Sequence, residues 1–231
     1  TGSANDAAVA IAEHISGSEE AFVAEMNTRA KEIGCTATQF TNSHGLHDEN
    51  QHTTARDSAK ILDAALRNQE FKRIFTADKY DVLPTNLSAE RHISSGNSME
   101  DPSSALYYDP RVLGGRTGVS ADGRRCLASV SEQNGMQIIT VVMGAESVYQ
   151  EDGFSAVSIG GYKETTKLLD LCFERYKTAQ VLYANQALRQ FRLEDGSCDV
   201  VIGPDCSITT VLPQGASMKD LSFQYNDVLQ K

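Results

Sequence analysis

The chain has 231 residues, of which 40% are hydrophobic and 23% charged, a composition typical of a globular protein with enough length for one or two packed domains. Its formal net charge of −10 argues against a nucleic-acid-binding surface, because phosphates are bound by clustered Lys and Arg. No apolar run approaches the roughly 20 residues of a membrane span. The five cysteines include no Cys-x-x-Cys pair, so no zinc or redox motif is expected. Cys198 and Cys206 could approach each other across a hairpin, but we predict free buried thiols for all five.

The N-terminal part of the chain is predicted to be helical. Residues 6–15 are alanine-rich and predict a buried helix. Ser18 is predicted to cap a second helix, with acidic residues in its first turn, and Gly34 is a natural stop for it. Residues 36–52 are polar and predict a loop.

A third helix is predicted to begin at a capping box, Thr54–Asp57, and to run to about Leu66, with residues 70–75 continuing as helix. The character of the chain then changes to short strands. These are predicted at 80–83, 91–95, 112–119, 124–131 and 136–143. Asn134-Gly135 separates the last two and predicts a tight hairpin.

A helix over about 159–176 is predicted to close the larger part of the chain. After it come short alternating segments with Gly and Pro breaks, at 190–193, 198–202 and 207–212. We therefore predict a boundary near Lys177, with a small β-rich module from 178 to 231.

The tripeptide Arg116-Thr117-Gly118 has the chemistry to bind an extended peptide that ends in a carboxylate. The guanidinium of Arg116 offers a planar fork of donors, and the hydroxyl of Thr117 adds another. Gly118 has no side chain, so a ligand backbone can come close. The alternative is that this stretch is only a glycine-rich entry to a strand, since such a tripeptide often occurs by chance.

Ser3-Ala4-Asn5 is a second short motif, and Ser95-Gly96-Asn97 matches the same pattern. Ser3–Asn5 could instead cap the helix that follows it, because Ser and Asn are good N-caps. The only cluster of histidines and carboxylates, between His44 and His52, lacks the spacing of a zinc site and reads as a polar loop. We expect no metal and no cofactor.

These segments together resemble the D-alanyl-D-alanine carboxypeptidases among the low-molecular-mass penicillin-binding proteins. Residues 3–14 resemble that family's Ser-Gly-Asn-Asp-Ala segment and its helix, which favours Ser3 over Ser95 as the motif serine. Residues 42–48 and 53–57 are similar to its Gly-Leu loop and Thr-Ala-x-Asp helix start. Residues 113–120 resemble its Gly-Ile-Lys-Thr-Gly-x-Thr strand, and 161–169 the helix before its C-terminal β-domain. The resemblance runs over nearly the whole chain, in the same order.

Two departures from the family pattern stand out. Arg116 replaces a lysine; it keeps the positive charge for a carboxylate but cannot give up a proton. The nucleophile motif Ser-x-x-Lys, which the family carries upstream of Ser-x-Asn, does not occur in this chain. We expect the chain to be N-terminally truncated and inactive as given.

The resemblance implies a mixed α/β (α+β) fold: a penicillin-binding or serine β-lactamase-like domain with an antiparallel sheet and helices over 1–177, then a small β-rich domain over 178–231. It implies a serine-type D-Ala-D-Ala carboxypeptidase that trims peptidoglycan stem peptides. By that resemblance Ser3 relays a proton to the leaving amine and Asn5 holds the substrate amide. Arg116 and Thr117 bind the terminal carboxylate beside Gly118, and the N–H of Val119 is one oxyanion donor. Ser3 and Arg116 are therefore expected to face one cleft.

The implied partners are a stem peptide ending in D-Ala-D-Ala and β-lactams as inhibitors, at an extracytoplasmic location in the cell envelope. No nucleic acid is expected, and a membrane anchor, if the protein has one, is not in this chain. Two other functions stay open. A serine β-lactamase shares these motifs but usually lacks a C-terminal β-module, and a non-catalytic cell-wall binding or scaffold protein would carry a degenerate site.

Overall fold

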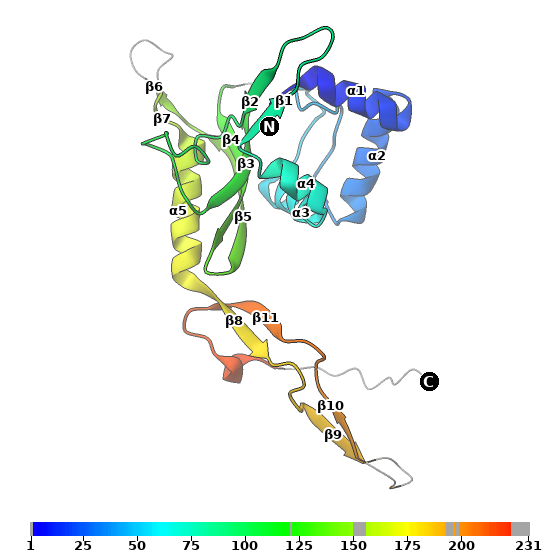
Figure 1. Cartoon of the computed structure of the whole chain (residues 1–231), viewed down its shortest axis with the longest axis vertical. Helices are drawn as coiled ribbons and strands as arrows, with labels where there is room; N and C mark the ends of the chain where they lie inside the picture. The colour runs from blue at the N-terminus through cyan, green and yellow to red at the C-terminus, as the bar shows by residue number, and fades with distance from the viewer. Residues whose placement is uncertain (1, 121, 150–155, 193–195, 197–198, 223–231) are drawn as a thin grey trace. The chain divides into compact units, whose positions relative to one another are not determined.

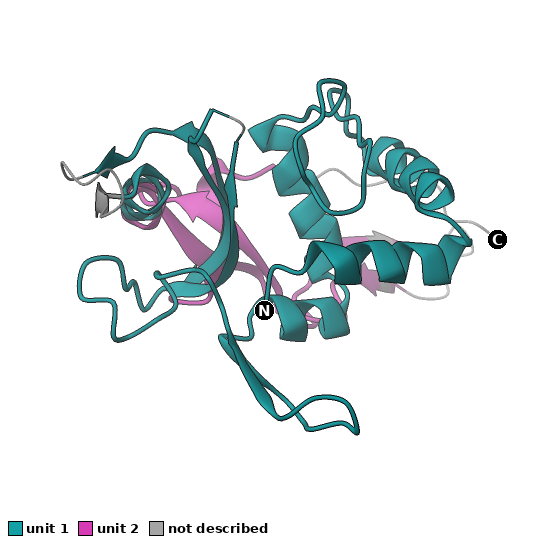
Figure 2. Cartoon of the chain, turned by 90° about the horizontal axis from the view of Figure 1, so that it is seen from above, with its two compact units in different colours: residues 1–132, 137–170 teal, residues 133–136, 171–231 magenta. Residues whose placement is uncertain are grey.

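The computed structural model describes residues 2–120, 122–149, 156–192, 196 and 199–222 (Figure 1). The chain divides into two compact units (Figure 2). The first contains residues 1–132 and 137–170, and the second contains residues 133–136 and 171–231. The division falls inside helix α5 (Gly160–Arg175).

The first unit opens with helices α1 (Asn5–Ser16), α2 (Glu19–Glu32), α3 (Ala55–Leu66) and α4 (Gln69–Phe75). The side chain of Ser18 accepts a hydrogen bond from the N–H of Ala21, and Thr54 accepts one from Asp57. These caps satisfy N–H groups that have no partner inside the helix. Gly34 follows α2 with a φ of 84°, the left-handed conformation that ends helices. The predicted caps at Ser18 and Thr54 and the predicted stop are confirmed. The capping box predicted at Thr54–Asp57 is only half formed, because the Asp57 carboxylate accepts hydrogen bonds from residues 36–38 and not from the N–H of Thr54.

Helix α1 is not the buried helix that its alanine-rich sequence predicts. Only Ala12 is buried in it, whereas Ile11 and Ile15 are 57% and 61% exposed. Helix α1 lies beside α2 (Figure 1), and one neighbouring helix can cover only one side of it. The prediction of burial is wrong because apolar composition alone does not say how many neighbours a helix has.

The centre of the first unit is a sheet of β3 (Val112–Val119), β4 (Arg125–Gln133) and β5 (Met136–Ala145), in that order. Strands β4 and β5 are joined at Asn134-Gly135, whose φ values of 52° and 74° are those that a type I′ hairpin turn requires. The predicted hairpin is confirmed. Strands β3 and β4 pair antiparallel, with Arg116 opposite Ala128.

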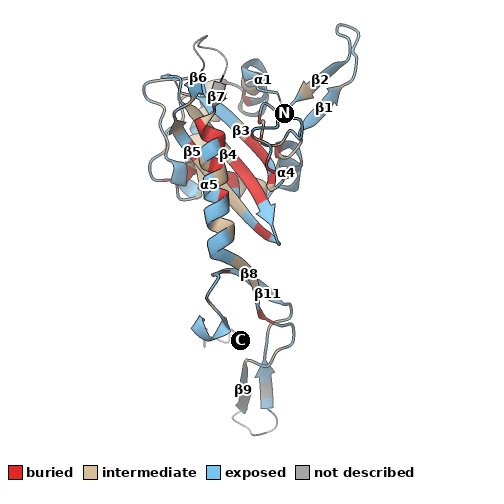
Figure 3. Ribbon diagram, turned by 90° about the vertical axis from the view of Figure 1, so that its left-hand side faces the viewer, coloured by how far each residue is buried: buried red, intermediate tan, exposed pale blue. Residues whose placement is uncertain are grey.

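Helices cover both faces of this sheet: α3 and α4 lie on one side and α5 on the other (Figure 1). On the first face Leu62, Phe75 and Val130 form a buried cluster. On the second face α5 packs closely on the sheet, since a Cβ built at Gly161 would be in van der Waals contact with the Cβ of Leu127, at 3.7 Å. Buried residues accordingly gather along these strands (Figure 3), and the central sheet holds the core.

Two small antiparallel pairs flank the core. Strands β1 (Lys79–Val82) and β2 (Arg91–Ser94) form the predicted pair. Strands β6 (Val148–Tyr149) and β7 (Ala156–Ser158) also pair, and the sequence did not predict them because they span two and three residues.

The second unit is rich in strands. Strand β8 (Tyr176–Leu182) pairs antiparallel with β11 (Ile208–Pro213), and β9 (Arg189–Arg192) pairs with β10 (Asp199–Ile202); a short 3-10 helix, η1, covers Met218–Asp220. Strand β8 was not predicted, since it begins directly where α5 ends. Among the described cysteines only Cys35 is buried; Cys126 and Cys172 are half-buried and Cys206 is exposed, so the prediction of buried thiols is confirmed for Cys35 and wrong for Cys206. Cys198 lies outside the described residues.

The predicted fold class, helices with antiparallel strand pairing, is confirmed. Within the residues that the structure describes, no helix combines the length and the apolar character needed to cross a membrane.

Candidate active site

Strand β3 offers an open edge in the described part of the chain: β4 pairs with one side, and no described strand pairs with the other. Ser120 donates its N–H to the carbonyl of Arg124 at 2.9 Å. In an antiparallel pair every second residue bonds to the partner strand, so Gly118 and Arg116, two and four residues earlier, also direct their backbone N–H groups to β4. The N–H groups of Thr117 and Val119 therefore point to the open edge. An extended peptide can pair with such an edge.

Arg116 is half-buried, and its guanidinium is held from three directions. Nη1 donates to the carbonyl of Gly115 at 2.6 Å, and Nη2 donates to the carbonyl of Ile74 at 3.1 Å. Cζ lies 5.0 Å from the centroid of the Phe75 ring. Because a guanidinium carries five N–H donors, two such bonds leave three for a ligand.

Thr117 faces away from Arg116, because successive side chains of a strand point to opposite faces. It lines a cavity of about 250 Å³ together with Ser98, Arg125 and Tyr162 on the α5 side of the sheet. The hydroxyl of Tyr162 closes this wall by donating to the carbonyl of Gly96 and accepting from the N–H of Ser98, both at 3.2 Å.

The last two motif positions on β3 leave room for a ligand. Gly118 is exposed, and a Cβ built there would meet only the Cβ of Cys126, at 3.8 Å. Val119 is 59% exposed at the end of the strand. Neither position is blocked by a described neighbour.

Ser3 and Asn5 lie at the entry to α1, and both are exposed. The N-cap of α1 is Ala4, and no side chain caps this end, so the capping explanation for Ser3–Asn5 does not hold. Neither side chain has a hydrogen bond to another described residue. Both remain available to a ligand.

Gly2, the residue before the N-terminal motif, and Arg116 both lie near Ile74 at the end of α4. Gly2, next to Ser3, lines a cavity of about 290 Å³ with Ile74, Ala77 and Ile93, among others. Ile74 is also the residue whose carbonyl accepts the Arg116 hydrogen bond. Thr117, in contrast, lines a different cavity, on the α5 side of the sheet. No one of these cavities is lined by all the predicted residues, and the expectation that Ser3 and Arg116 face one cleft stays a prediction.

The second Ser-x-Asn, Ser95-Gly96-Asn97, has a structural role. Asn97 is 2% exposed, and its amide donates to Oε1 of Glu100 at 2.7 Å while its Oδ1 accepts from the N–H of Met99. It packs against β3, since a Cβ built at Gly115 would lie 2.8 Å from Asn97 Nδ2. Asn97 is thus bonded inside the fold, and the preference for Ser3 as the motif serine stays a prediction.

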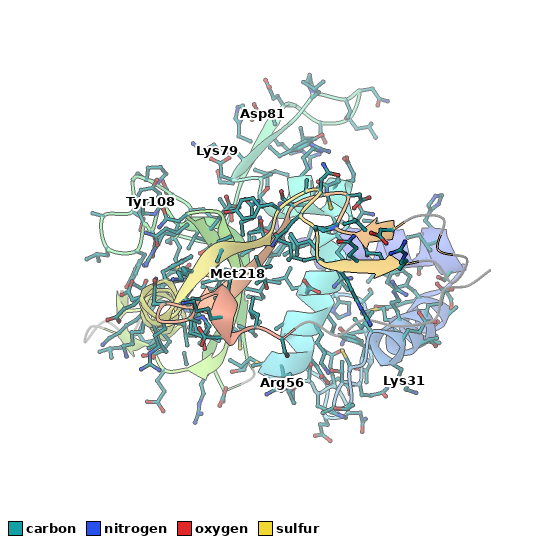
Figure 4. The ribbon with its side chains drawn as sticks, turned by 90° about the horizontal axis from the view of Figure 1, so that it is seen from below. Lys31, Arg56, Lys79, Asp81, Tyr108 and Met218 are labelled. Carbon is teal, nitrogen blue, oxygen red and sulfur yellow. The ribbon has the colours of Figure 1, made fainter. Side chains whose placement is uncertain are left out.

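Glu100, which the sequence did not single out, is bonded to Asn97, the residue that packs against β3. Burial raises the pKa of its carboxyl, against the hydrogen bonding of Asn97 and Ser95 and the charge of Arg116, which lower it. Its Oε2 is buried and has no partner in hydrogen-bonding geometry among the described residues. Glu100 lines a polar cavity of about 180 Å³ with Lys79, which Figure 4 labels on β1. No local pattern marks this glutamate, because its setting depends on distant residues.

The polar loop after α2 is built on two carboxylates. Asp57, 1% exposed, accepts hydrogen bonds from the N–H groups of Thr36 and Ala37 and from the hydroxyl of Thr38. Glu19 accepts from the N–H and the hydroxyl of Ser43. Hydrogen bonding from the Ala37 and Ser43 backbones lowers the pKa of Asp57 and of Glu19 respectively. Among the described residues no group of three or more His, Cys, Asp or Glu is placed to hold a metal ion.

Solved structures give the class of this fold. Penicillin binding protein 5 from Haemophilus influenzae superposes with a TM-score of 0.70 and 29% identity, over 92% of this chain and 57% of that one. PBP3 from Streptococcus pneumoniae, described as a peptidoglycan synthesis regulatory factor, shares the fold with a TM-score of 0.72 and 22% identity, over 93% of this chain and 59% of its own. The chain therefore has the fold of the penicillin-binding proteins.

The family follows from the sequence comparisons. A family model described as D-alanyl-D-alanine carboxypeptidase matches residues 1–147, and the chain belongs to this family. The carboxypeptidase DacF of Bacillus subtilis (strain 168) is 30% identical over 95% of this chain and 52% of its own length. DacA of Haemophilus influenzae is 32% identical over 84% of this chain and 44% of its own length. The chain thus spans about half the length of these relatives.

Proposed function

We propose that this chain provides the substrate-binding strand of a serine-type D-Ala-D-Ala carboxypeptidase that trims peptidoglycan stem peptides outside the cytoplasm. The observation that carries the proposal is the open edge of β3, where Arg116 and the outward N–H groups of Thr117 and Val119 lie side by side. We further propose that the chain is inactive as given, because its sequence contains no Ser-x-x-Lys.

In this proposal the end of the stem peptide pairs with the open edge of β3 as an added strand. Its terminal carboxylate meets the cation of Arg116 at this edge, while Thr117, whose side chain points to the opposite face of the strand, offers its hydroxyl from that side. The missing side chain at Gly118 lets the two backbones approach. The N–H of Val119 then points at the scissile carbonyl, where negative charge develops in the transition state.

The chemistry needs a serine from a Ser-x-x-Lys segment. Its oxygen attacks the carbonyl of the penultimate D-alanine, its proton passes to a base, and the bond to the last D-alanine breaks as the leaving amine takes a proton. In this proposal Ser3 relays that proton, and Asn5 holds the substrate amide. Water then cleaves the acyl-enzyme and restores the serine. β-Lactams would acylate the same oxygen.

The test uses a longer form of the protein, in which a Ser-x-x-Lys segment precedes residue 1, and measures D-alanine release from diacetyl-Lys-D-Ala-D-Ala. We expect release by the longer form and none by the chain as given. Penicillin hydrolysis faster than D-alanine release would instead support a β-lactamase. Absence of both activities in a folded longer form would support a non-catalytic protein and contradict the proposal.

A further inference from the structure

The guanidinium of Arg116, on β3, packs against the end of helix α4. Cζ of Arg116 lies 5.0 Å from the Phe75 ring centroid, and Nη2 donates to the carbonyl of Ile74, the preceding residue. The last two residues of α4 thus supply both an aromatic face and a hydrogen-bond acceptor for one guanidinium. Planar guanidinium groups stack well on aromatic rings, and the ring quadrupole attracts their charge.

The Phe75 ring is fixed independently of Arg116. It is 7% exposed and belongs to the buried cluster with Leu62 and Val130. Phe71 of the same helix stacks on it with ring centroids 5.5 Å apart. A ring held by the core on several sides is a rigid platform, because close-packed interiors allow little displacement.

Gly114 brings this platform to the strand. A Cβ built at Gly114 would lie 2.8 Å from both the carbonyl oxygen of Phe75 and the Cα of Thr76. Any larger residue would therefore push the end of α4 away from β3. The glycine two residues before Arg116 allows the contact between ring and guanidinium.

From this geometry we infer that Phe75 is a positioning residue for Arg116: it holds the guanidinium at the edge of β3, ready for the substrate carboxylate. The inference rests on the proposed function. A long side chain that is already ordered loses less conformational entropy when it binds, so the gain appears in substrate affinity. The hydrogen bonds to Ile74 and Gly115 orient the group and leave three N–H donors for the ligand.

A purely structural role for Phe75 makes a different prediction. Loss of the ring would then lower stability and reduce activity by the same factor whether or not Arg116 is present. A double-mutant cycle separates the two roles, because only a positioning residue shows coupling to Arg116.

The kinetic test uses Phe75→Leu in the longer form, with and without Arg116→Ala, and Phe71→Leu as the matched control on the same helix. With Arg116 present, we expect Phe75→Leu to lower kcat/KM about two- to fivefold, the size of a partly exposed cation–π contact, mainly through KM. In the Arg116→Ala background we expect almost no further loss, and little effect from Phe71→Leu in either. Equal factors for Phe75→Leu in both backgrounds would overturn the inference.

A second measurement uses the chain as given and needs no activity. In the folded chain, the Nε–Hε resonance of Arg116 should be displaced by the ring current of Phe75 and should return toward the value of a free arginine in Phe75→Leu. If that variant does not fold, Phe75→Met removes the ring while filling more of its volume. An undisplaced Arg116 resonance in the parent chain would refute the positioning. If the longer form releases no D-alanine, the proposed function fails, and this spectrum still decides whether Phe75 holds Arg116.

Discussion

Two glycines of strand β3 should respond to alanine in opposite ways. A Cβ at Gly114 would lie 2.8 Å from the Phe75 carbonyl oxygen and 2.8 Å from the Thr76 Cα, both backbone atoms that cannot move cheaply. A Cβ at Gly118 would find its nearest neighbour, the Cβ of Cys126, at 3.8 Å, an ordinary contact. Neither glycine has the positive φ that would strain an alanine, so space alone decides the outcome.

The magnitudes follow from these contacts. Overpacking of a tight site costs about 1–3 kcal/mol, and for a chain of this size each kcal/mol lowers Tm by about 2–4 °C. Gly114→Ala should therefore lower Tm by roughly 2 to 12 °C. Gly118→Ala should change the free energy of unfolding by less than about 0.5 kcal/mol. Its methyl group would instead stand where the substrate backbone passes, and displacement of the reacting groups should slow acylation about tenfold or more.

The assay has two parts. Thermal unfolding of both variants in the chain as given measures stability, and the rate of acylation by a labelled penicillin in the longer form measures the site. An equal loss of stability in the two variants would contradict the packing argument. Unimpaired acylation of Gly118→Ala would remove this glycine from the ligand path.

Three further predictions concern charged groups. Arg116→Ala in the longer form should lower kcat/KM about tenfold or more, since a charge-assisted hydrogen bond contributes about 1.5–3 kcal/mol. Arg116→Lys should keep most of the parent kcat/KM, because it keeps the positive charge. An unchanged kcat/KM for the alanine variant in steady-state kinetics would exclude the arginine from the site. Burial raises the pKa of Glu100, so the folded chain should lose stability as the pH rises from about 4.5 to the raised pKa. The stability of Glu100→Gln minus that of the parent should therefore be larger at pH 7 than at pH 4, and denaturant unfolding at both pH values checks the sign. Hydrogen bonding from the Ala37 backbone lowers the pKa of Asp57, whose contribution to stability is present above pH 3.8 and is lost as the pH falls through the lowered pKa; Asp57→Asn should therefore destabilise the chain more at pH 7 than at pH 3, and an equal effect at both would show that the charge is not what matters.

Local features of this chain could be predicted because their causes are local. Ser18 and Thr54 cap helices through bonds to residues three positions away, and Asn134-Gly135 makes its turn by its own backbone preferences. The position of Arg116 on a strand likewise follows from the pattern of its neighbours.

What the sequence did not predict depends on distant contacts. The exposure of Ile11 and Ile15 reflects how few neighbours α1 has, which no periodicity reveals. The sequence shows Phe75 only as an apolar residue at the end of a helix, and its contact with Arg116 forms only in the folded chain. The burial of Glu100 likewise depends on residues that are distant in the sequence. Strand β8 starts directly after α5, with no turn residue between them, so the sequence pattern did not indicate a separate strand there.

The most direct test of the account is the intact mass of the protein after incubation with penicillin, for the chain as given and for the form in which a Ser-x-x-Lys segment precedes it. If the edge of β3 is the binding strand of a serine carboxypeptidase and the nucleophile lies outside this chain, the longer form should gain one penicillin per molecule and the chain alone should gain none. A stoichiometric adduct on the chain alone, or a folded longer form that stays unmodified, would contradict the account.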